Sequence, residues 1–291
     1  MANVWDAIKK HQAEEAQRLQ VPAQSTEARS EMPPAAAPAP PAAPAAPPAA
    51  APVPQIKVES VHVGKLGENG SFSESLVAHH DRGGALTEEY RALRTSLLAQ
   101  CPDERFCYLV TSADAGEGKT VTAANLALVM AERVDRRTIL IDCDLRKRKL
   151  AAMLNGKLSP GMVELLRGTA SFKEVIQPTV CPNLFFIPPG EVKTEEVGEL
   201  MGRPELDEIV SELRRHYDYM LFDTPPINVV SDAGMLGRAT GGAILVVRMN
   251  KTHRESVDKA VRLLHAANVN VAGMVLTHRT FLIPNYLYRY S

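Results

Sequence analysis

The stretch FCYLVTSADAGEGKT (residues 106–120) decides the fold. Its first six residues form a short apolar run, which indicates a buried β-strand. Its last three, Gly118, Lys119 and Thr120, end the phosphate-loop pattern GxxxxGK[ST], although Ala113 replaces the first glycine. A helical pattern follows directly. A loop between a strand and a helix turns its backbone N–H groups toward phosphate oxygens, so the stretch predicts a nucleotide-binding α/β domain.

The loop also predicts which residues hold the nucleotide. Lys119 is expected to bridge the β- and γ-phosphates, and the Thr120 hydroxyl to bind Mg²⁺. Glycines let the backbone approach the phosphates closely. The expected nucleotide-binding residues are Ala115, Gly116, Glu117, Gly118, Lys119, Thr120 and Val121.

Carboxylates end two further apolar runs. In ILIDCDLR, Asp142 and Asp144 are two residues apart, so an extended backbone sends both side chains to the same side. A later run, YMLFDTPP, ends in Asp223. Carboxylates beside a phosphate loop repel one another unless a cation is present, and Mg²⁺ supplies that cation. One carboxylate can then hold the metal's water shell while another accepts a proton from an incoming hydroxyl. An acidic turn in solvent is the alternative.

Short apolar runs and helical patterns alternate through the rest of the chain. This alternation predicts a three-layer α/β fold with a doubly wound parallel sheet, whose ligand lies at the carboxyl ends of the strands. The expected strands are 106–111, 138–142, 183–188, 218–223, 243–248 and 270–277. The expected helices lie near 119–133, 161–167, 194–215 and 253–267, with a short one started by a Ser171–Glu174 capping box.

The first eighty residues have a different composition. Residues 33–54 contain only Pro, Ala and one Val, which predicts an extended spacer without a core. Residues 2–20 can form a short helix carrying Trp5, and residues 55–80 are Ser/Gly/Glu-rich and expected to be loosely structured. The N-terminal extension is therefore expected to be largely disordered.

Bulk properties exclude several classes of protein. The 33 Lys and Arg nearly balance the 34 Asp and Glu, so no global charge points to nucleic acid. The four cysteines show no CxxC spacing, which favours a reduced compartment. No apolar run approaches the roughly 20 residues that span a bilayer, so a cytoplasmic protein is expected.

Two further sequence motifs lie on either side of the predicted nucleotide-binding domain. EEYRALR carries Glu88, Arg91 and Arg94 as E-x-x-R-x-x-R just before the first strand, and the chain ends with NYLYRYS. Together with the phosphate loop and both acidic motifs, in this order, the chain resembles the bacterial tyrosine kinases of capsule and exopolysaccharide synthesis. These are P-loop ATPases of the MinD/ParA-like type. The resemblance covers about residues 84–291.

The resemblance implies ATP and Mg²⁺ as cofactors, with Thr120, Asp144 and Asp223 at the metal and Asp142 as the base for the tyrosine hydroxyl. Lys119 and the three aspartates are then the catalytic residues. It also implies that Glu88, Arg91 and Arg94 contact a neighbouring subunit in a ring. The tail of one subunit would enter the site of the next, so that autophosphorylation occurs in trans. The implied phosphorylation sites are Tyr286, Tyr288 and Tyr290.

The same resemblance implies partners and an organisation of the chain. A separate polysaccharide co-polymerase with a cytosolic activating segment would recruit the protein to the inner membrane, and a cognate phosphatase would reverse its phosphorylation. No nucleic acid is expected. The expected segments are an N-terminal helix (1–20), a Pro/Ala-rich and polar linker (21–80), a P-loop kinase domain (81–280) and a tyrosine-rich tail (281–291).

Among the departures of the sequence from the family pattern, two concern the nucleotide site. Ala115 replaces a usual proline, and Thr277 stands where relatives often have an adenine-contacting Asn. Two other interpretations stay open. A MinD/ParA-like switch ATPase without kinase activity usually has an early lysine in the loop, where this chain has Asp114. An adaptor that binds nucleotide without turnover is the other. The alternating tail tyrosines could also form an edge strand.

Overall fold

The computed structural model describes residues 72–101, 103–230 and 232–278. The chain divides into two units, Met1–Ile56 and Lys57–Ser291, and the described residues all belong to the second. The predicted N-terminal helix, most of the linker and the tyrosine tail lie outside the described residues. Within the described part, no helix has both the length and the apolar character needed to cross a membrane.

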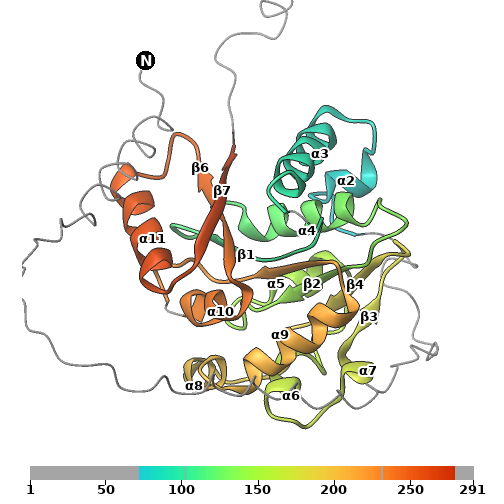
Figure 1. The fold of residues 1–291 in the computed structure, drawn as a ribbon, viewed down its shortest axis with the longest axis vertical. Coiled ribbons are helices and arrows are strands. Elements are labelled where there is room, and N and C mark those ends of the chain that lie inside the picture. Colours follow the sequence, from blue (N-terminus) through green and yellow to red (C-terminus); the bar gives the residue numbers. More distant parts are fainter. Residues whose placement is uncertain (1–71, 102, 231, 279–291) are drawn as a thin grey trace, which may run out of the picture. The chain divides into compact units, whose positions relative to one another are not determined.

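A seven-stranded sheet forms the centre of the second unit, in the order β3-β4-β2-β5-β1-β6-β7 (Figure 1). Every neighbouring pair is parallel except β3 with β4. The predicted parallel sheet is therefore confirmed, with a two-residue antiparallel edge strand that the sequence did not indicate. The strands are β1 (Phe106–Ser112), β2 (Thr138–Asp142), β3 (Gln177–Pro178), β4 (Leu184–Ile187), β5 (Tyr219–Asp223), β6 (Gly242–Arg248) and β7 (Asn270–Thr277).

Helices cover both faces of the sheet, which confirms the three-layer arrangement (Figure 1). One face carries α2 (Val77–His80), α3 (Ala85–Leu98), α4 (Lys119–Met130) and α5 (Lys149–Met153). The other carries α6 (Met162–Leu166), α7 (Phe172–Val175), α8 (Val197–Met201), α9 (Glu205–His216), α10 (Asp232–Thr240) and α11 (Arg254–Ala266).

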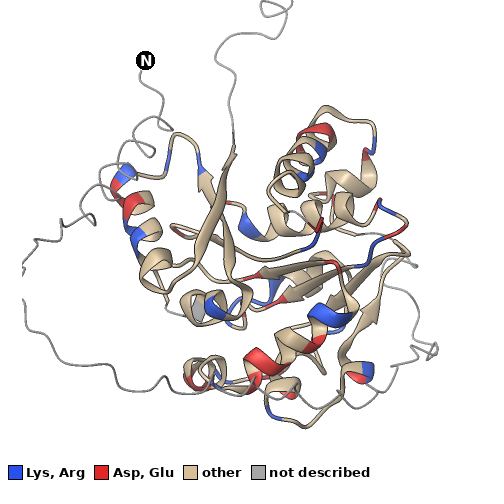
Figure 2. Ribbon diagram, in the orientation of Figure 1, with Lys and Arg blue, Asp and Glu red and all other residues tan. Residues whose placement is uncertain are grey.

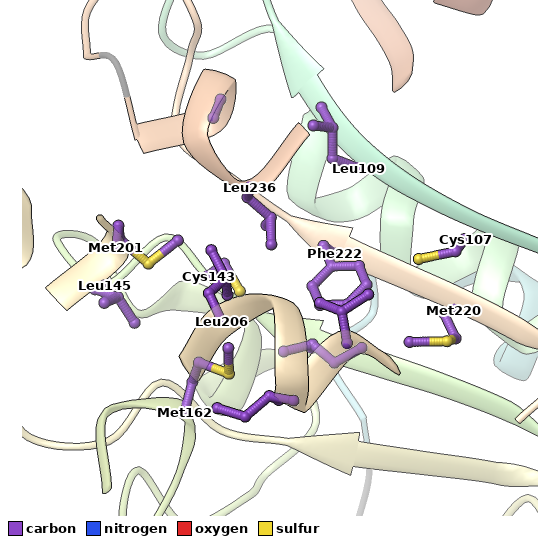
Figure 3. Packing of buried hydrophobic residues seen from close by; sticks show 14 of the residues in the cluster. Cys107, Leu109, Cys143, Leu145, Met162, Met201, Leu206, Met220, Phe222 and Leu236 are labelled. Carbon is purple, nitrogen blue, oxygen red and sulfur yellow. The ribbon is translucent and has the colours of Figure 1, made fainter. Parts of the chain in front are cut away.

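Strand residues alternate between two buried clusters, one on each face. In β5, Met220 and Phe222 pack with the α9 side, while Tyr219 and Leu221 pack with the α4 side. Figure 3 shows the first of these clusters, in which Phe222 and Cys143 lie among side chains from α8, α9 and α10. Successive side chains of an extended segment point to opposite faces. Because Cys143 packs into this cluster, the side chains of its neighbours Asp142 and Asp144 are expected to point to the opposite face of the sheet.

The predicted helix over 194–215 is wrong as a single element. The chain forms a 3₁₀ turn (Thr194–Glu196), then α8, and starts α9 only after Gly202 and Pro204. Pro204 lacks the N–H that a continuous helix would need there. In α9, acidic residues occupy the first turn and basic residues the last, which is the arrangement that the helix dipole favours (Figure 2).

Residues 72–80 also differ from the expectation of a loose segment. Phe72 and Leu76 are almost fully buried against α4 and its neighbours. The Asn125 side chain of α4 fixes this segment, since its Oδ1 accepts the Ala78 N–H at 2.9 Å and its Nδ2 donates to the Ser75 carbonyl at 3.0 Å. The folded unit therefore begins before residue 81.

The packing of residues 72–80 against α4 predicts that two leucine-to-alanine substitutions will have different effects on stability. Leu76→Ala is expected to lower the free energy of unfolding by about 2–5 kcal/mol, because it opens a cavity in a packed cluster. Leu86→Ala on α3 should change it by less than about 0.5 kcal/mol, since Leu86 is 58% exposed. Urea unfolding of the full chain measures both. Equal costs would contradict the docking of residues 72–80.

Candidate active site

The phosphate loop leaves β1 at Ser112 and enters α4 at Lys119. Gly116 and Gly118 have φ angles of 81° and 93°, a region that favours glycine. Gly118 is the N-cap of α4, and no side chain caps the helix there. The first N–H groups of α4 are thus available to an anion, as expected for a phosphate site.

Lys119 lies at the centre of the candidate site. Its ammonium donates to Asp144 Oδ2 at 2.8 Å and to Asp223 Oδ1 at 3.2 Å, and it reaches the Thr120 hydroxyl at 3.2 Å. Burial disfavours the charged lysine, but the nearby Asp223 and Asp144 carboxylates outweigh it and raise the pKa of Lys119. Residues from the loop and from two strands thus converge at one edge of the sheet.

Asp142 is buried beside this cluster. It lies opposite Asp223 in the register between β2 and β5, and its Oδ1 accepts the Asp144 N–H at 3.1 Å. Its other oxygen is buried and has no hydrogen-bond partner. Burial, and then the charges of Asp223 and Asp144, raise the pKa of Asp142 well above its usual range. A buried carboxylate oxygen without a donor is a feature that a bound ligand or an incoming hydroxyl can satisfy.

These donors fit a magnesium ion bound together with a nucleotide. The site gathers the carboxylates of Asp144 and Asp223 and the hydroxyl of Thr120, with one lysine as the nearby cation. Within the described residues, no group of three or more His, Cys, Asp and Glu side chains can hold a metal by itself. Mg²⁺ usually binds one or two protein carboxylates and completes its shell with phosphates and water.

The segment after Asp223 is fixed to β1. The Thr224 hydroxyl donates to the Val110 carbonyl at 3.1 Å, and the Thr111 hydroxyl donates to the Pro225 carbonyl at 2.8 Å. Both threonines are fully buried. These bonds hold Asp223 in position against the phosphate loop.

The other loop residues have unequal surroundings. Ala115 and Gly116 are exposed, and Val121 is half-buried. Glu117 is only 2% exposed, which the sequence did not indicate for an acidic residue in a glycine-rich loop. No local pattern could have revealed this, because two of its hydrogen-bond partners, Thr252 and Thr277, are far along the chain.

The E-x-x-R-x-x-R residues of α3 bind within their own chain. Arg91 contacts Glu132 and Glu88, each at 2.5 Å, and Arg94 contacts Glu132 at 2.9 Å. Glu132 follows α4, so the two arginines hold α3 against the helix that begins in the phosphate loop. Their predicted contact with a neighbouring subunit stays a prediction.

Several known proteins are similar to this chain. The family model described as an AAA domain matches residues 109–257. EpsB of Ralstonia solanacearum is 34% identical over 205 residues, which cover 70% of this chain and 26% of EpsB. The tyrosine-protein kinase YwqD of Bacillus subtilis is 32% identical over 206 residues, covering 70% of this chain and 86% of YwqD. The chain belongs to the bacterial tyrosine kinase family.

Solved structures agree with this family. The kinase domain of the Escherichia coli tyrosine kinase ETK is 28% identical with a TM-score of 0.67, covering 76% of this chain and 88% of that domain. MinD of Pyrococcus horikoshii with Mg-ADP is 26% identical with a TM-score of 0.52, covering 64% of this chain and 76% of MinD. The fold therefore fits both kinds of protein, and the relatives favour the kinase over the switch ATPase. The chain spans about a quarter of the length of EpsB.

Proposed function

We propose that this chain is a protein-tyrosine kinase that uses ATP and Mg²⁺ to phosphorylate Tyr286, Tyr288 and Tyr290 of another copy. One observation carries the proposal. A phosphate loop, its lysine and three buried carboxylates converge at one sheet edge in a chain of the tyrosine kinase family.

The residues divide the work of phosphoryl transfer. Lys119 neutralises negative charge on the transferred group, and the N–H groups at the start of α4 hold the phosphates. Thr120, Asp144 and Asp223 would hold Mg²⁺, which neutralises further charge on the phosphate oxygens. Asp142 accepts the proton of the tyrosine hydroxyl. A base is needed because a phenol has a pKa of about 10 and is mostly protonated at neutral pH.

The product would regulate the enzyme. Each phosphotyrosine adds about −1.5 to −2 charges, which the buried aspartates repel. Phosphorylation would therefore release the tail and loosen an assembly. We further propose that a polysaccharide co-polymerase at the inner membrane activates the kinase, that a phosphatase resets it, and that the cycle regulates exopolysaccharide or capsule polymerisation and export.

Phosphotyrosine mapping tests the proposed function. Incubation of the purified full chain with ATP and Mg²⁺ is expected to place phosphate on the three tail tyrosines, as detected by mass spectrometry. A variant with Tyr286, Tyr288 and Tyr290 changed to Phe should lose nearly all of the signal. A wild-type chain that hydrolyses ATP but carries no phosphotyrosine would support the switch ATPase instead.

The predicted contact of α3 with a neighbouring subunit is tested by changing the arginines and the glutamate of its ion pairs separately. If Arg91 and Arg94 contact a neighbour, changing both to Ala should shift light scattering toward the monomer. Glu132→Ala should leave assembly intact, because it frees the same arginines. If the ion pairs only stabilise the fold of one subunit, the Arg and Glu variants will lower the free energy of unfolding by similar amounts. The mass of the assembly in light scattering will then be unchanged.

The same ion pairs predict a pH dependence. Hydrogen bonds from Arg91 first, and then from Arg94, lower the pKa of Glu132 although partial burial opposes them. A lowered pKa means that the pairing stabilises the fold above the ordinary glutamate pKa. The contribution is lost as pH falls through the lowered pKa. Urea unfolding at a series of pH values measures this contribution. The free energy of unfolding of Glu132→Gln should be lower than that of wild type at neutral pH, and the two values should converge in acid.

A further inference from the structure

Glu117 is a carboxylate in a loop that binds polyanions, and its hydrogen bonds go to other parts of the chain. Its Oε2 accepts the Asp114 N–H at 3.0 Å, and its Oε1 accepts the Thr252 hydroxyl. Its backbone carbonyl accepts the Thr277 hydroxyl at 2.6 Å. The side chain is 2% exposed, so these bonds satisfy a group that burial would otherwise penalise.

Three segments meet at this residue. Thr252 lies in the turn between β6 and α11, and its N–H donates to the Arg248 carbonyl at 3.1 Å. Thr277 is the last residue of β7, and its carbonyl accepts the Met249 N–H at 3.0 Å. Both threonines are thus fixed to the carboxyl end of β6, and both hold the phosphate loop through Glu117.

The contacts also confine the neighbouring glycine. A Cβ built on Gly118 would lie 3.5 Å from Cγ2 of Thr277, so the end of β7 lies directly against the loop. Ser112, the last residue of β1, adds a further bond to the loop, since its hydroxyl donates to the Asp114 carbonyl at 2.8 Å. A glycine-rich loop has many accessible conformations, and each of these contacts removes some of them.

We propose that Glu117 is a positioning residue that ties the phosphate loop to Thr252 and Thr277 and holds it ready for a nucleotide. The proposal rests on the proposed function only in that this loop binds ATP. Its carboxylate needs no contact with the phosphates, because it acts through the backbone of the loop. A preorganised loop loses less conformational entropy when the nucleotide binds.

The test compares two substitutions of Glu117. Glu117→Ala removes both acceptors and should weaken ATP and ADP affinity on the order of 10-fold. Glu117→Gln should retain affinity within about 3-fold, because its carbonyl oxygen can accept the Asp114 N–H and its amide can donate to Thr252. Thr252→Val and Thr277→Val should each give a smaller loss than Glu117→Ala. Calorimetric titration of the full chain with each nucleotide and Mg²⁺ measures these values.

A matched control separates positioning from general stability. Thr240 at the end of α10 donates its hydroxyl to the Gly237 carbonyl at 3.1 Å and is also buried. Thr240→Val should lower stability without changing nucleotide affinity. In turnover assays, Glu117→Ala should raise KM for ATP more than it lowers kcat.

Several outcomes would overturn the proposal. These are wild-type affinity in Glu117→Ala, equal losses in Glu117→Ala and Glu117→Gln, or losses in all variants that follow their unfolding temperatures, Thr240→Val included. Nucleotide affinity is independent of tyrosine transfer. If neither wild type nor any variant phosphorylates tyrosine, but the nucleotide affinities follow the expected order, the kinase proposal fails and the role of Glu117 stands.

Discussion

Lys119→Met is expected to lower tyrosine phosphorylation at least about 10²–10³-fold, because it removes the cation that meets the charge of the transferred phosphoryl group. The ammonium lies within 3.2 Å of both Asp144 and Asp223, so it is held in position before the nucleotide arrives. Quantitative phosphotyrosine mass spectrometry of the tail measures the loss.

The same substitution should also destabilise the fold. It leaves the buried Asp144 and Asp223 carboxylates without their cation, which typically costs about 3–5 kcal/mol. Loss of activity alone would therefore not separate chemistry from unfolding. The double variant Lys119→Met with Asp144→Asn removes one of the stranded charges and should recover much of the stability without recovering activity.

Two results would contradict this account of Lys119. One is a tail signal in Lys119→Met equal to that of wild type. The other is recovery of phosphorylation together with stability in the double variant, which would make the lysine only a structural counterion. Unfolding by urea with a chelator present gives the stability of all three chains on one scale.

The sequence predicted the features that depend on local periodicity. Strand alternation alone placed Asp142 and Asp144 on one side, and Cys143 does pack into the cluster on the opposite face. The strand–loop–helix pattern around Lys119 predicted where α4 begins. Both inferences need only neighbouring residues, because the period of a strand or helix fixes the direction of its side chains.

The sequence could not predict contacts between distant segments. Glu117 meets Thr252 and Thr277, which lie 135 and 160 residues further along the chain. Arg91 and Arg94 gave a familiar motif, but nothing in it indicated Glu132 as their shared partner. Phe72 and Leu76 stand in a polar stretch without helical periodicity, so their burial follows only from the surface that α4 offers them.

Asp142→Asn is expected to lower the turnover number about 10²–10⁴-fold while ATP affinity changes only a few-fold, because an amide cannot accept the tyrosine proton. The substitution conserves shape, and its carbonyl oxygen can still accept the Asp144 N–H that Asp142 now binds at 3.1 Å. Single-turnover phosphorylation and calorimetric ATP titration measure the two effects separately. Asp258→Asn on α11 is the control, since Asp258 is exposed and distant from the loop in the sequence.

A second readout makes the assignment of Asp142 stricter. Burial and the charges of Asp223 and Asp144 raise the pKa of Asp142, so its ionised form disfavours folding. Its contribution to stability is therefore present below the ordinary aspartate pKa and is lost as pH rises through the raised pKa. Asparagine stays neutral, so with a chelator present the variant should have a higher free energy of unfolding than wild type at neutral pH. A base that costs stability when charged predicts a more stable, inactive variant. An active Asp142→Asn chain would instead move the proton acceptor to Asp144 or Asp223.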